Sequence, residues 1–285
     1  MPPYPVAMTG DAAVEPLRFG TAAGRWALVG TVLGSGMTML DGTVVNIALP
    51  RLGRDLDADF AGLQWVVNGY TLALASLILL GGSLGDRLGR RRVFSVGVVW
   101  FTVASLLCAL APTIGLLVAA RVLQGIGGAL LVPGSLAMLQ ASFHPDDRAR
   151  AIGAWSGLGG VTTAIGPFLG GWLVDAASWR WIFLLNVPLG AVVVYVVLVH
   201  LPETKDPTIE GRLDLLGAVL GAAGLAAITY GFIERTFLVG GIGAALFAAF
   251  LVAESREAHP MLSLSVFRSR QFSAANGVTF VLYGE

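Results

Sequence analysis

Charge is almost absent from long stretches of this sequence, and that absence indicates its class. Only 13% of the 285 residues are charged and 55% are hydrophobic, whereas a soluble domain carries about 25% charged residues. Eight apolar runs are each long enough to cross the hydrocarbon core of a bilayer as a helix. A soluble protein of this length does not need so many uncharged runs. We therefore expect an all-α integral membrane protein.

Other kinds of chemistry are missing as well. The single cysteine, Cys108, excludes an intrachain disulfide and lies in an apolar run, as a small buried side chain would. The three histidines show no metal-ligand spacing, and no phosphate-binding loop of the G-x-x-x-x-G-K-S/T type is present. The net charge of +0 gives no indication of a nucleic-acid partner. We expect no enzyme, no cofactor, no metal site and no bound nucleic acid.

The apolar runs define the expected membrane helices. These spans are Trp26–Ala48, Gln64–Gly82, Val93–Ala111, Ile114–Leu139, Ala151–Leu173, Trp181–Val199, Leu215–Ile233 and Thr236–Ala253. A ninth apolar run begins near Gln271 and reaches Glu285, which is too short to cross. Residues 1–24 contain early prolines and no apolar run, which indicates a short disordered tail rather than a signal peptide.

Lysine and arginine are distributed unequally between the connecting segments. If the tail is cytoplasmic, the cytoplasmic segments hold 13 of the 18 Lys and Arg residues and the external segments hold 4. Positively charged residues are concentrated on the cytoplasmic side of membrane proteins. The sequence thus predicts a multi-pass protein of the plasma (inner) membrane with a cytoplasmic N-terminus.

Within the eight spans, only Asp41 and Arg121 carry a formal charge. A charge at mid-membrane costs about 2.5–3.5 kcal/mol on the insertion scale, so it usually marks a polar pathway. At 1.5 Å per residue, Asp41 lies about 22 Å from the inner surface and Arg121 about 10 Å from the outer one, which places both at a similar depth. Gln124 extends the polar face by one turn. We expect these three residues to take part in proton-linked transport. A static salt bridge, or an arginine that reaches outward, is the alternative. Further candidate lining residues are Asn46, Asn68 and Tyr70.

Four short motifs stand at helix boundaries in a defined order. They are LDGTVVNIALP (Leu40–Pro50), GSLGDRLGRRRVF (Gly82–Phe94), RVLQGIGGA (Arg121–Ala129) and GPFLGG (Gly166–Gly171). Together they resemble the major facilitator superfamily, and WRWIFLLNVPLG (Trp179–Gly190) resembles its fourteen-helix drug:proton antiporters. The resemblance implies an N-terminal six-helix transporter bundle (25–200), a cytoplasmic linker (201–214), two inserted transmembrane helices (215–254), a cytoplasmic loop (255–270) and the start of a C-terminal half (271–285).

The second motif can be interpreted from its residues. Gly82, Gly85 and Gly89 can let two helices turn sharply and approach closely. Asp86 can accept from a neighbouring helix N-terminus, and the arginines that follow can pair with acids or lipid phosphates. The resemblance implies a gating loop that contacts the second half of a carrier, formed by Gly82, Asp86, Arg87, Gly89, Arg90 and Arg91. A positively charged anchor without a gating role is the alternative.

The fourth motif lies in the fifth span. Proline removes a backbone hydrogen bond and bends a helix, while glycines let a neighbour pack close. The resemblance implies an antiporter kink that resists leaks during exchange, formed by Gly166, Pro167, Gly170 and Gly171. Thr162 stands where the family pattern has a further glycine. An ordinary packing kink is the alternative.

These features predict proton-coupled efflux of drug-like or lipophilic small molecules by alternating access. The expected partners are a small-molecule substrate, protons and the lipid bilayer. Major facilitator carriers are built from two six-helix halves, so the resemblance implies a missing C-terminal half and a truncated or split carrier. Two alternatives stay open: a non-transporting membrane fragment, and a carrier for another small solute.

Overall fold

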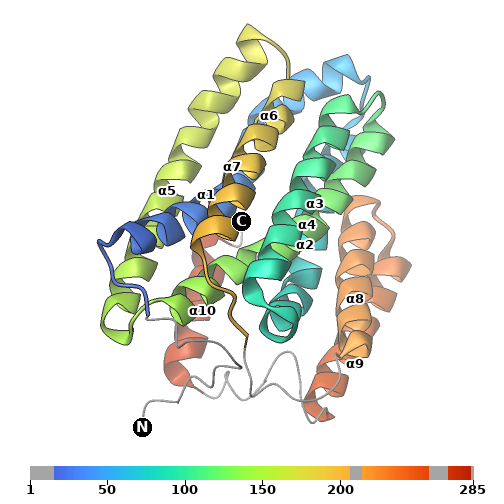
Figure 1. Cartoon of the computed structure of the whole chain (residues 1–285). Helices are drawn as coiled ribbons and strands as arrows, with labels where there is room; N and C mark the ends of the chain where they lie inside the picture. Colours follow the sequence, from blue (N-terminus) through green and yellow to red (C-terminus); the bar gives the residue numbers. More distant parts are fainter. Residues whose placement is uncertain (1–15, 206–213, 257–268, 284–285) are drawn as a thin grey trace. The chain divides into compact units, whose positions relative to one another are not determined.

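The computed structural model describes residues 16–205, 214–256 and 269–283 (Figure 1). Within these residues it is helical throughout, with ten helices and no extended strand. Eight of the described segments are long and apolar enough to cross a membrane, where a helix pairs its own backbone polar groups. The expected all-α membrane fold is therefore confirmed. The chain forms two compact units, Met1–Glu210 and Gly211–Glu285.

The first unit contains the helices α1 to α7. Their bounds are Ala22–Asp55 (α1), Phe60–Leu88 (α2), Arg90–Leu110 (α3), Ile114–Ser142 (α4), Pro145–Ala176 (α5), Arg180–Leu184 (α6) and Asn186–His200 (α7). Most are longer than the predicted spans, because the helical backbone continues beyond the apolar run into polar residues. In α1 the helix passes through Pro50 and ends with an ion pair between Arg51 and Asp55, one turn apart.

The sixth span is confirmed as one segment, Arg180–His200, in which the hydrogen-bond pattern breaks at Leu185 although its backbone angles stay helical. Pro188 has no backbone N–H to donate to the carbonyl of Leu184, so the regular ladder fails there. The interruption makes Asn186 the first residue of α7, and its side chain is completely buried. The sixth apolar run thus places the buried polar side chain of Asn186 at the break between α6 and α7.

Part of the predicted disordered tail is ordered. Residues 1–15 lie outside the described residues, but the backbone N–H of Leu17 donates to the carbonyl of Ser142, and the N–H of His144 donates to Leu17. The N–H of Phe19 donates to the Asp147 carboxylate at 3.2 Å. The segment before α1 is thereby fastened to the connection between α4 and α5.

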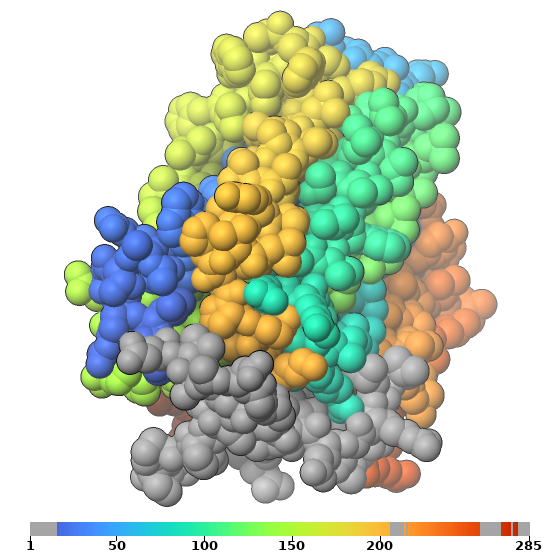
Figure 2. Space-filling view, in the orientation of Figure 1, coloured from blue at the N-terminus to red at the C-terminus, as the bar shows by residue number. Residues whose placement is uncertain are grey.

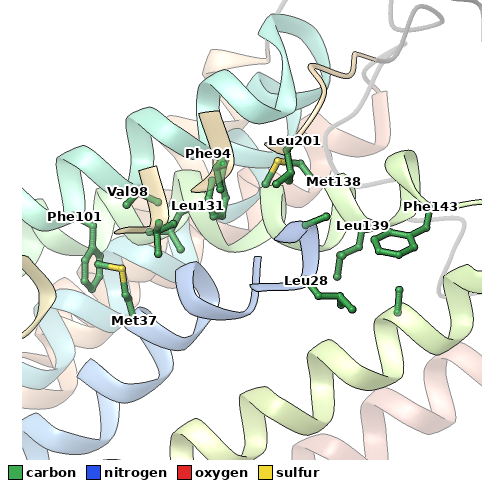
Figure 3. Packing of buried hydrophobic residues seen from close by; sticks show 14 of the residues in the cluster. Leu28, Met37, Phe94, Val98, Phe101, Leu131, Met138, Leu139, Phe143 and Leu201 are labelled. Carbon is green, nitrogen blue, oxygen red and sulfur yellow. The ribbon is translucent and has the colours of Figure 1, made fainter. Parts of the chain in front are cut away.

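Buried apolar side chains of this unit gather in two clusters. The first, which we call the Phe94 cluster, includes Phe94, Met37, Phe101, Leu131 and Phe143 (Figure 3). The second, the Trp179 cluster, includes Trp179, Val44, Leu52, Leu117 and Phe183. Each cluster draws on several helices, so the two clusters hold the bundle together at two levels.

Large apolar side chains also cover the outside of the first unit. Phe168 and Trp172 of α5 are 82% and 65% exposed, which would be costly in water but is favourable against lipid tails. In Figure 2, α7 occupies the middle of the visible face of this unit, and it packs against α1 and α3. The surface and the core both fit a bundle whose solvent is the bilayer.

Glycines let α4 lie directly against its neighbours α2 and α3. A Cβ atom on Gly127 would come within 2.7 Å of the Phe101 backbone nitrogen in α3. A Cβ on Gly125 would collide with the Tyr70 carbonyl in α2, and one on Gly81 of α2 would collide with the Ala129 carbonyl. Since backbone atoms cannot move aside as a flexible side chain can, these crossings require glycine.

Replacing Gly127 by alanine is therefore expected to lower the free energy of unfolding by about 1–3 kcal/mol through overpacking. Gly115→Ala is the matched control on the same helix, because nothing lies within 4 Å of its added Cβ. Titration of the protein in mixed detergent micelles, followed by tryptophan fluorescence, measures both variants. Equal stability of the two variants would contradict the close crossing.

The second unit contains α8 (Leu215–Ile233), α9 (Phe237–Arg256) and α10 (Arg270–Tyr283). The Asp214 side chain caps α8 by accepting from the Gly217 N–H at 2.8 Å. Helices α8 and α9 form a close hairpin, in which a Cβ on Gly224 would lie 2.8 Å from the Phe247 nitrogen. The ninth apolar run forms the 14-residue helix α10. Within the predicted linker and loop, residues 206–213 and 257–268 lie outside the described residues.

Candidate functional site

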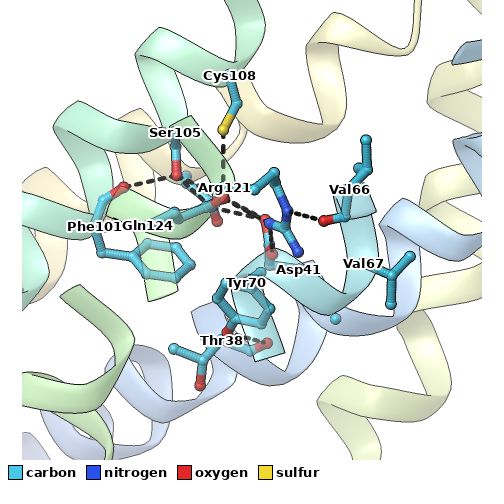
Figure 4. Close-up of polar contacts among 12 residues, drawn as sticks. Thr38, Asp41, Val66, Val67, Tyr70, Phe101, Ser105, Cys108, Arg121 and Gln124 are labelled. Atoms are coloured by element: carbon cyan, nitrogen blue, oxygen red, sulfur yellow. Dashed lines mark hydrogen bonds and ion pairs between the residues drawn. The ribbon is translucent and has the colours of Figure 1, made fainter. Parts of the chain in front are cut away.

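The two charges of the membrane spans meet in the interior of the first unit (Figure 4). Arg121 Nη1 donates to Asp41 Oδ2, and the whole residues are only 1% and 2% exposed. Asp41 comes from α1 and Arg121 from α4, so the pair joins two helices that are far apart in sequence. The partners neutralise each other, which offsets much of the cost of burying either charge alone.

Three neutral polar side chains complete the cluster around this pair. Gln124 Nε2 donates to Asp41 Oδ1 at 2.9 Å and to Ser105 Oγ at 2.8 Å. Asn186 Nδ2 donates to the same two oxygens, at 3.4 and 3.2 Å. We call Asp41, Arg121, Gln124, Ser105 and Asn186 the polar cluster. It connects α1, α3, α4 and α7 through buried hydrogen bonds.

Arg121 is held by more than its carboxylate partner. Its Nε donates to the Val66 carbonyl at 3.1 Å, and Nη1 also donates to Gln124 Oε1 at 2.6 Å. The guanidinium carbon lies 4.1 Å from the centre of the Tyr70 ring, which is a favourable cation–π position. The arginine therefore keeps several partners if the carboxylate changes its charge.

The polar cluster lies between the two apolar clusters. Along α1 the chain passes from Met37 in the Phe94 cluster to Asp41 and then to Val44 in the Trp179 cluster. Along α3 it passes from Phe101 through Ser105 to Cys108 in the same way. Apolar packing on both sides limits access by water, so protonation of Asp41 would change a poorly hydrated site.

Sequence reasoning identified Asp41, Arg121 and Gln124, and the structure brings these three together. Ser105 and Asn186 were not predicted. For Asn186 the sequence offered a signal, because it is a lone asparagine in an apolar run, two residues before Pro188. Tyr70 lies against Arg121, whereas Asn46 is exposed. The Asn46 side chain donates to the Gly42 carbonyl of its own helix.

The predicted gating loop is a one-residue break between two helices. Gly89 has φ of +116°, a backbone conformation that favours glycine, and it separates α2 from α3. Gly82, Asp86 and Arg87 belong to α2, and Arg90 and Arg91 begin α3. Gly82 makes only ordinary contact with Pro133, while the tight approach to α4 is at Gly81.

The arginines of this loop pair with acids, as predicted: Arg90 with Asp86 and Arg91 with Glu203. The partner of Asp86 differs from the prediction. Asp86 Oδ1 accepts from Arg90 Nε at 2.7 Å rather than from a neighbouring helix N-terminus. That position is taken by Glu203, whose carboxylate accepts from the Arg91 backbone N–H at 3.0 Å and lies 3.7 Å from Arg92 Nε. The segment after α7 is thus fastened to the start of α3, a tertiary contact that the sequence did not indicate.

The fourth motif forms a close crossing between α5 and α1. A Cβ on Gly166 would collide with the Thr43 hydroxyl, and one on Gly170 would lie 2.7 Å from Val44 Cγ1. Helix α5 continues through Pro167, and Gly171 lies just outside the tight part of the contact. Thr162 of α5 stands where the family pattern has a glycine, and it packs against Gly36 of α1. The glycine at this helix contact is therefore on α1 rather than on α5.

Comparisons with known proteins agree with this architecture. The chain is 37% identical to a probable actinorhodin transporter of Streptomyces coelicolor, over 93% of this chain and 50% of that protein. It is 38% identical to the multidrug resistance protein Stp of Mycobacterium tuberculosis, over 90% of this chain and 50% of that protein. The chain spans about half the length of these curated relatives.

The fold itself is found among solved transporters. A mutant of the peptide transporter POT in complex with sulfate superimposes with a TM-score of 0.64 at 17% identity, covering 85% of this chain and 55% of that one. The family model of the Major Facilitator Superfamily matches residues 31–283. This chain is a multi-pass membrane protein that belongs to the Major Facilitator Superfamily of transporters.

Proposed function

We propose that this chain works in proton-coupled export of drug-like, lipophilic small molecules by alternating access. The observation that carries the proposal is the buried Asp41–Arg121 pair, at the only two formal charges of the predicted spans. Its similarity to drug resistance and antibiotic transport proteins supports the substrate class. The relatives extend over about twice its length, so the proposal assigns the complete activity to this unit acting with a second half of a carrier.

In this proposal Asp41 is the proton carrier. When Asp41 is ionised, it is bound to Arg121 and to the amides of Gln124 and Asn186. A proton from the external side neutralises the carboxylate and weakens the α1–α4 link, which permits the return from the outward-facing to the inward-facing state. Arg121 keeps its contacts with Val66 and Tyr70 during this step.

The two glycine motifs have supporting roles in the proposed cycle. The Asp86–Arg90 pair and the Glu203 contacts hold the α2–α3 junction together at one end of the bundle, where a change of partners can gate the carrier. The Gly166 and Gly170 crossing keeps α5 against α1 beside the polar cluster. Close packing there limits proton leakage along the site.

The proposal is tested by reconstituting the complete product of the gene that encodes this chain into liposomes. Ethidium is the probe. An imposed pH gradient is expected to drive ethidium accumulation in proteoliposomes, and an ethidium gradient is expected to move protons in the opposite direction. Protein-free liposomes are the control. Ethidium movement that is equal with and without the pH gradient would reject proton coupling. If neither ethidium nor tetraphenylphosphonium moves faster than in protein-free liposomes, export of lipophilic cations is rejected.

We also propose a cytoplasmic N-terminus, on the basis of the Lys and Arg distribution. Phe60 and Leu88 are exposed at opposite ends of α2, and the native Cys108 is buried. In intact cells, a membrane-impermeant maleimide is expected to label Phe60→Cys but not Leu88→Cys, and cell disruption should make Leu88→Cys reactive. The reverse pattern would show the opposite orientation.

A further inference from the structure

Asn186 has a buried oxygen that the described structure leaves unused. Its side-chain nitrogen donates to Asp41 and Ser105, but its Oδ1 atom has no hydrogen-bond partner. A buried carbonyl without a partner costs about 1–3 kcal/mol. Such an atom calls for an explanation, and one that fits this site is that another protonation state of the protein uses it. The neighbouring group that can change state is the Asp41 carboxylate.

Every hydrogen bond that the structure records on Asp41 is donated to it. Arg121 has no acceptor atom at all. The Oε1 atom of Gln124 already accepts from Arg121 at 2.6 Å and from the Cys108 thiol at 3.6 Å. This arrangement suits an ionised carboxylate. A protonated Asp41 carries an O–H group that must donate to an acceptor, and among the groups bonded to it only Asn186 has one without a partner.

We propose that Asn186 is a proton-responsive amide switch, which donates to ionised Asp41 and accepts from protonated Asp41. A hydronium ion transfers its proton to a lone pair of Asp41 Oδ1, which forms an O–H bond on the carboxyl group and leaves a water molecule. The Asn186 amide then turns by half a rotation, which exchanges Nδ2 for Oδ1 at nearly the same place. The new hydrogen bond runs from Asp41 to Asn186. This inference rests on the proposed proton binding at Asp41.

The turn has a consequence for the helices. In the ionised state the Asn186 amide also donates to Ser105, so it links α7 to α3 as well as to α1. After the turn that donor points away from Ser105, whose own hydroxyl hydrogen is donated to the Phe101 carbonyl at 2.8 Å. The α7–α3 link is then lost while the α7–α1 link is kept. Asn186 is the first residue of α7, so the turn of its amide changes the link at the N-terminal end of this helix.

The surroundings of Asp41 contain few other groups that could replace this switch. The charged or titratable side chains that face the carboxylate are Arg121 from α4, Tyr70 from α2 and Cys108 from α3. The Tyr70 hydroxyl donates to the Thr38 carbonyl, at 3.4 Å, and the thiol donates to Gln124. The Asn186 amide is thus the neutral group on α7 that contacts both Asp41 and α3.

Infrared difference spectroscopy between acidic and alkaline pH, on the protein in liposomes, tests this switch. A protonated carboxyl band that disappears in Asp41→Asn identifies Asp41. Asn186→Leu, which has a similar volume and no polar atom, is expected to shift that band to higher wavenumber because its hydrogen bond is lost. Proton-driven ethidium accumulation is expected to fall about tenfold. Asn46→Leu is the control, because Asn46 is an exposed asparagine on α1. This substitution should leave the carboxyl band of Asp41 at its wild-type wavenumber.

The outcomes separate this inference from the proposed function. If no carboxyl band is lost in Asp41→Asn, proton binding at Asp41 is wrong and the switch is wrong with it. If the band is present but unmoved in Asn186→Leu, only the switch is wrong. Should Asn186→Leu fail to fold, wild-type protein with ¹³C-labelled asparagine side chains gives the same test. One amide carbonyl band should then shift to lower wavenumber as Asp41 is protonated, and no such shift would overturn the switch.

Discussion

Replacing Asp41 by asparagine is expected to abolish proton-driven accumulation of ethidium in proteoliposomes. Asparagine has nearly the same shape and can still accept from Arg121, but it cannot take up a proton in this pH range. The side chain of the Asp41→Asn variant is therefore neutral at every pH, like a protonated Asp41. Substrate can still exchange across the membrane at equal pH on both sides, because that exchange needs no proton. The two measurements, accumulation under a pH gradient and exchange without one, are made on the same preparation.

The control is Asp41→Glu, which keeps a titratable carboxylate beside Arg121 and is expected to retain part of the coupling. Asp55→Asn is a second control, since this carboxylate pairs with Arg51 at the exposed end of α1. Accumulation by Asp41→Asn at the wild-type rate would show that Asp41 is not the proton carrier. Its pairing with Arg121 would then be a structural contact between α1 and α4.

Replacing Arg121 by leucine is expected to lower the free energy of unfolding by about 3–5 kcal/mol, because it leaves the Asp41 charge buried without its partner. The double variant with Asp41→Asn is expected to recover most of that loss, since no unpaired charge remains. Stability is measured by titration in mixed detergent micelles. The free energy of unfolding of Arg121→Lys is expected to lie between those of the wild type and of Arg121→Leu. An ammonium group keeps the charge but cannot reproduce the planar set of donors to Asp41, Val66 and Gln124.

Arg51→Leu provides the matched control for this series. Its ion pair with Asp55 is also one arginine with one carboxylate, but the side chains are 48% and 35% exposed, so its loss is expected to cost less than about 1 kcal/mol. If Arg121→Leu is no less stable than Arg51→Leu, the Asp41–Arg121 pair does not carry the stability assigned to it. Failure of the double variant to recover would instead indicate that the packing of Arg121 on Tyr70 matters more than its charge.

The membrane helices could be predicted because lipid imposes a continuous apolar run on each of them. Their ends could not, because the helix continues where the residues become polar. Helix α5 begins at Pro145, followed by Asp146 and Asp147, six residues before the predicted span at Ala151. The interruption at Leu185 was also missed, since the residues on both sides are apolar and only Pro188 marked it.

The charged pair of the polar cluster and the neighbouring Gln124 could be predicted, but the neutral members Ser105 and Asn186 could not. A formal charge is rare in a span, and its depth follows from counting residues, which is how Asp41 and Arg121 were placed together. Serine and threonine are common in membrane helices and often bond to their own backbone, as Thr102 does with Val98. Nothing in the sequence distinguishes Ser105 from such residues. The partner of Glu203 depends on how the segment after α7 returns to α3, which is a tertiary property.

The hydrogen bonds of Leu17 and Phe19 with residues around the α4–α5 connection set an order of events during synthesis. Phe19 and Asp147 are separated by 128 positions in the sequence, and a chain grows at about 5–20 residues per second. The backbone groups before α1 therefore wait roughly 6 to 26 seconds for their partners while the intervening helices are made. During that interval α1 lacks its attachment at this end. The N-terminal end of α1 is therefore secured only after α4 and the start of α5 have been made.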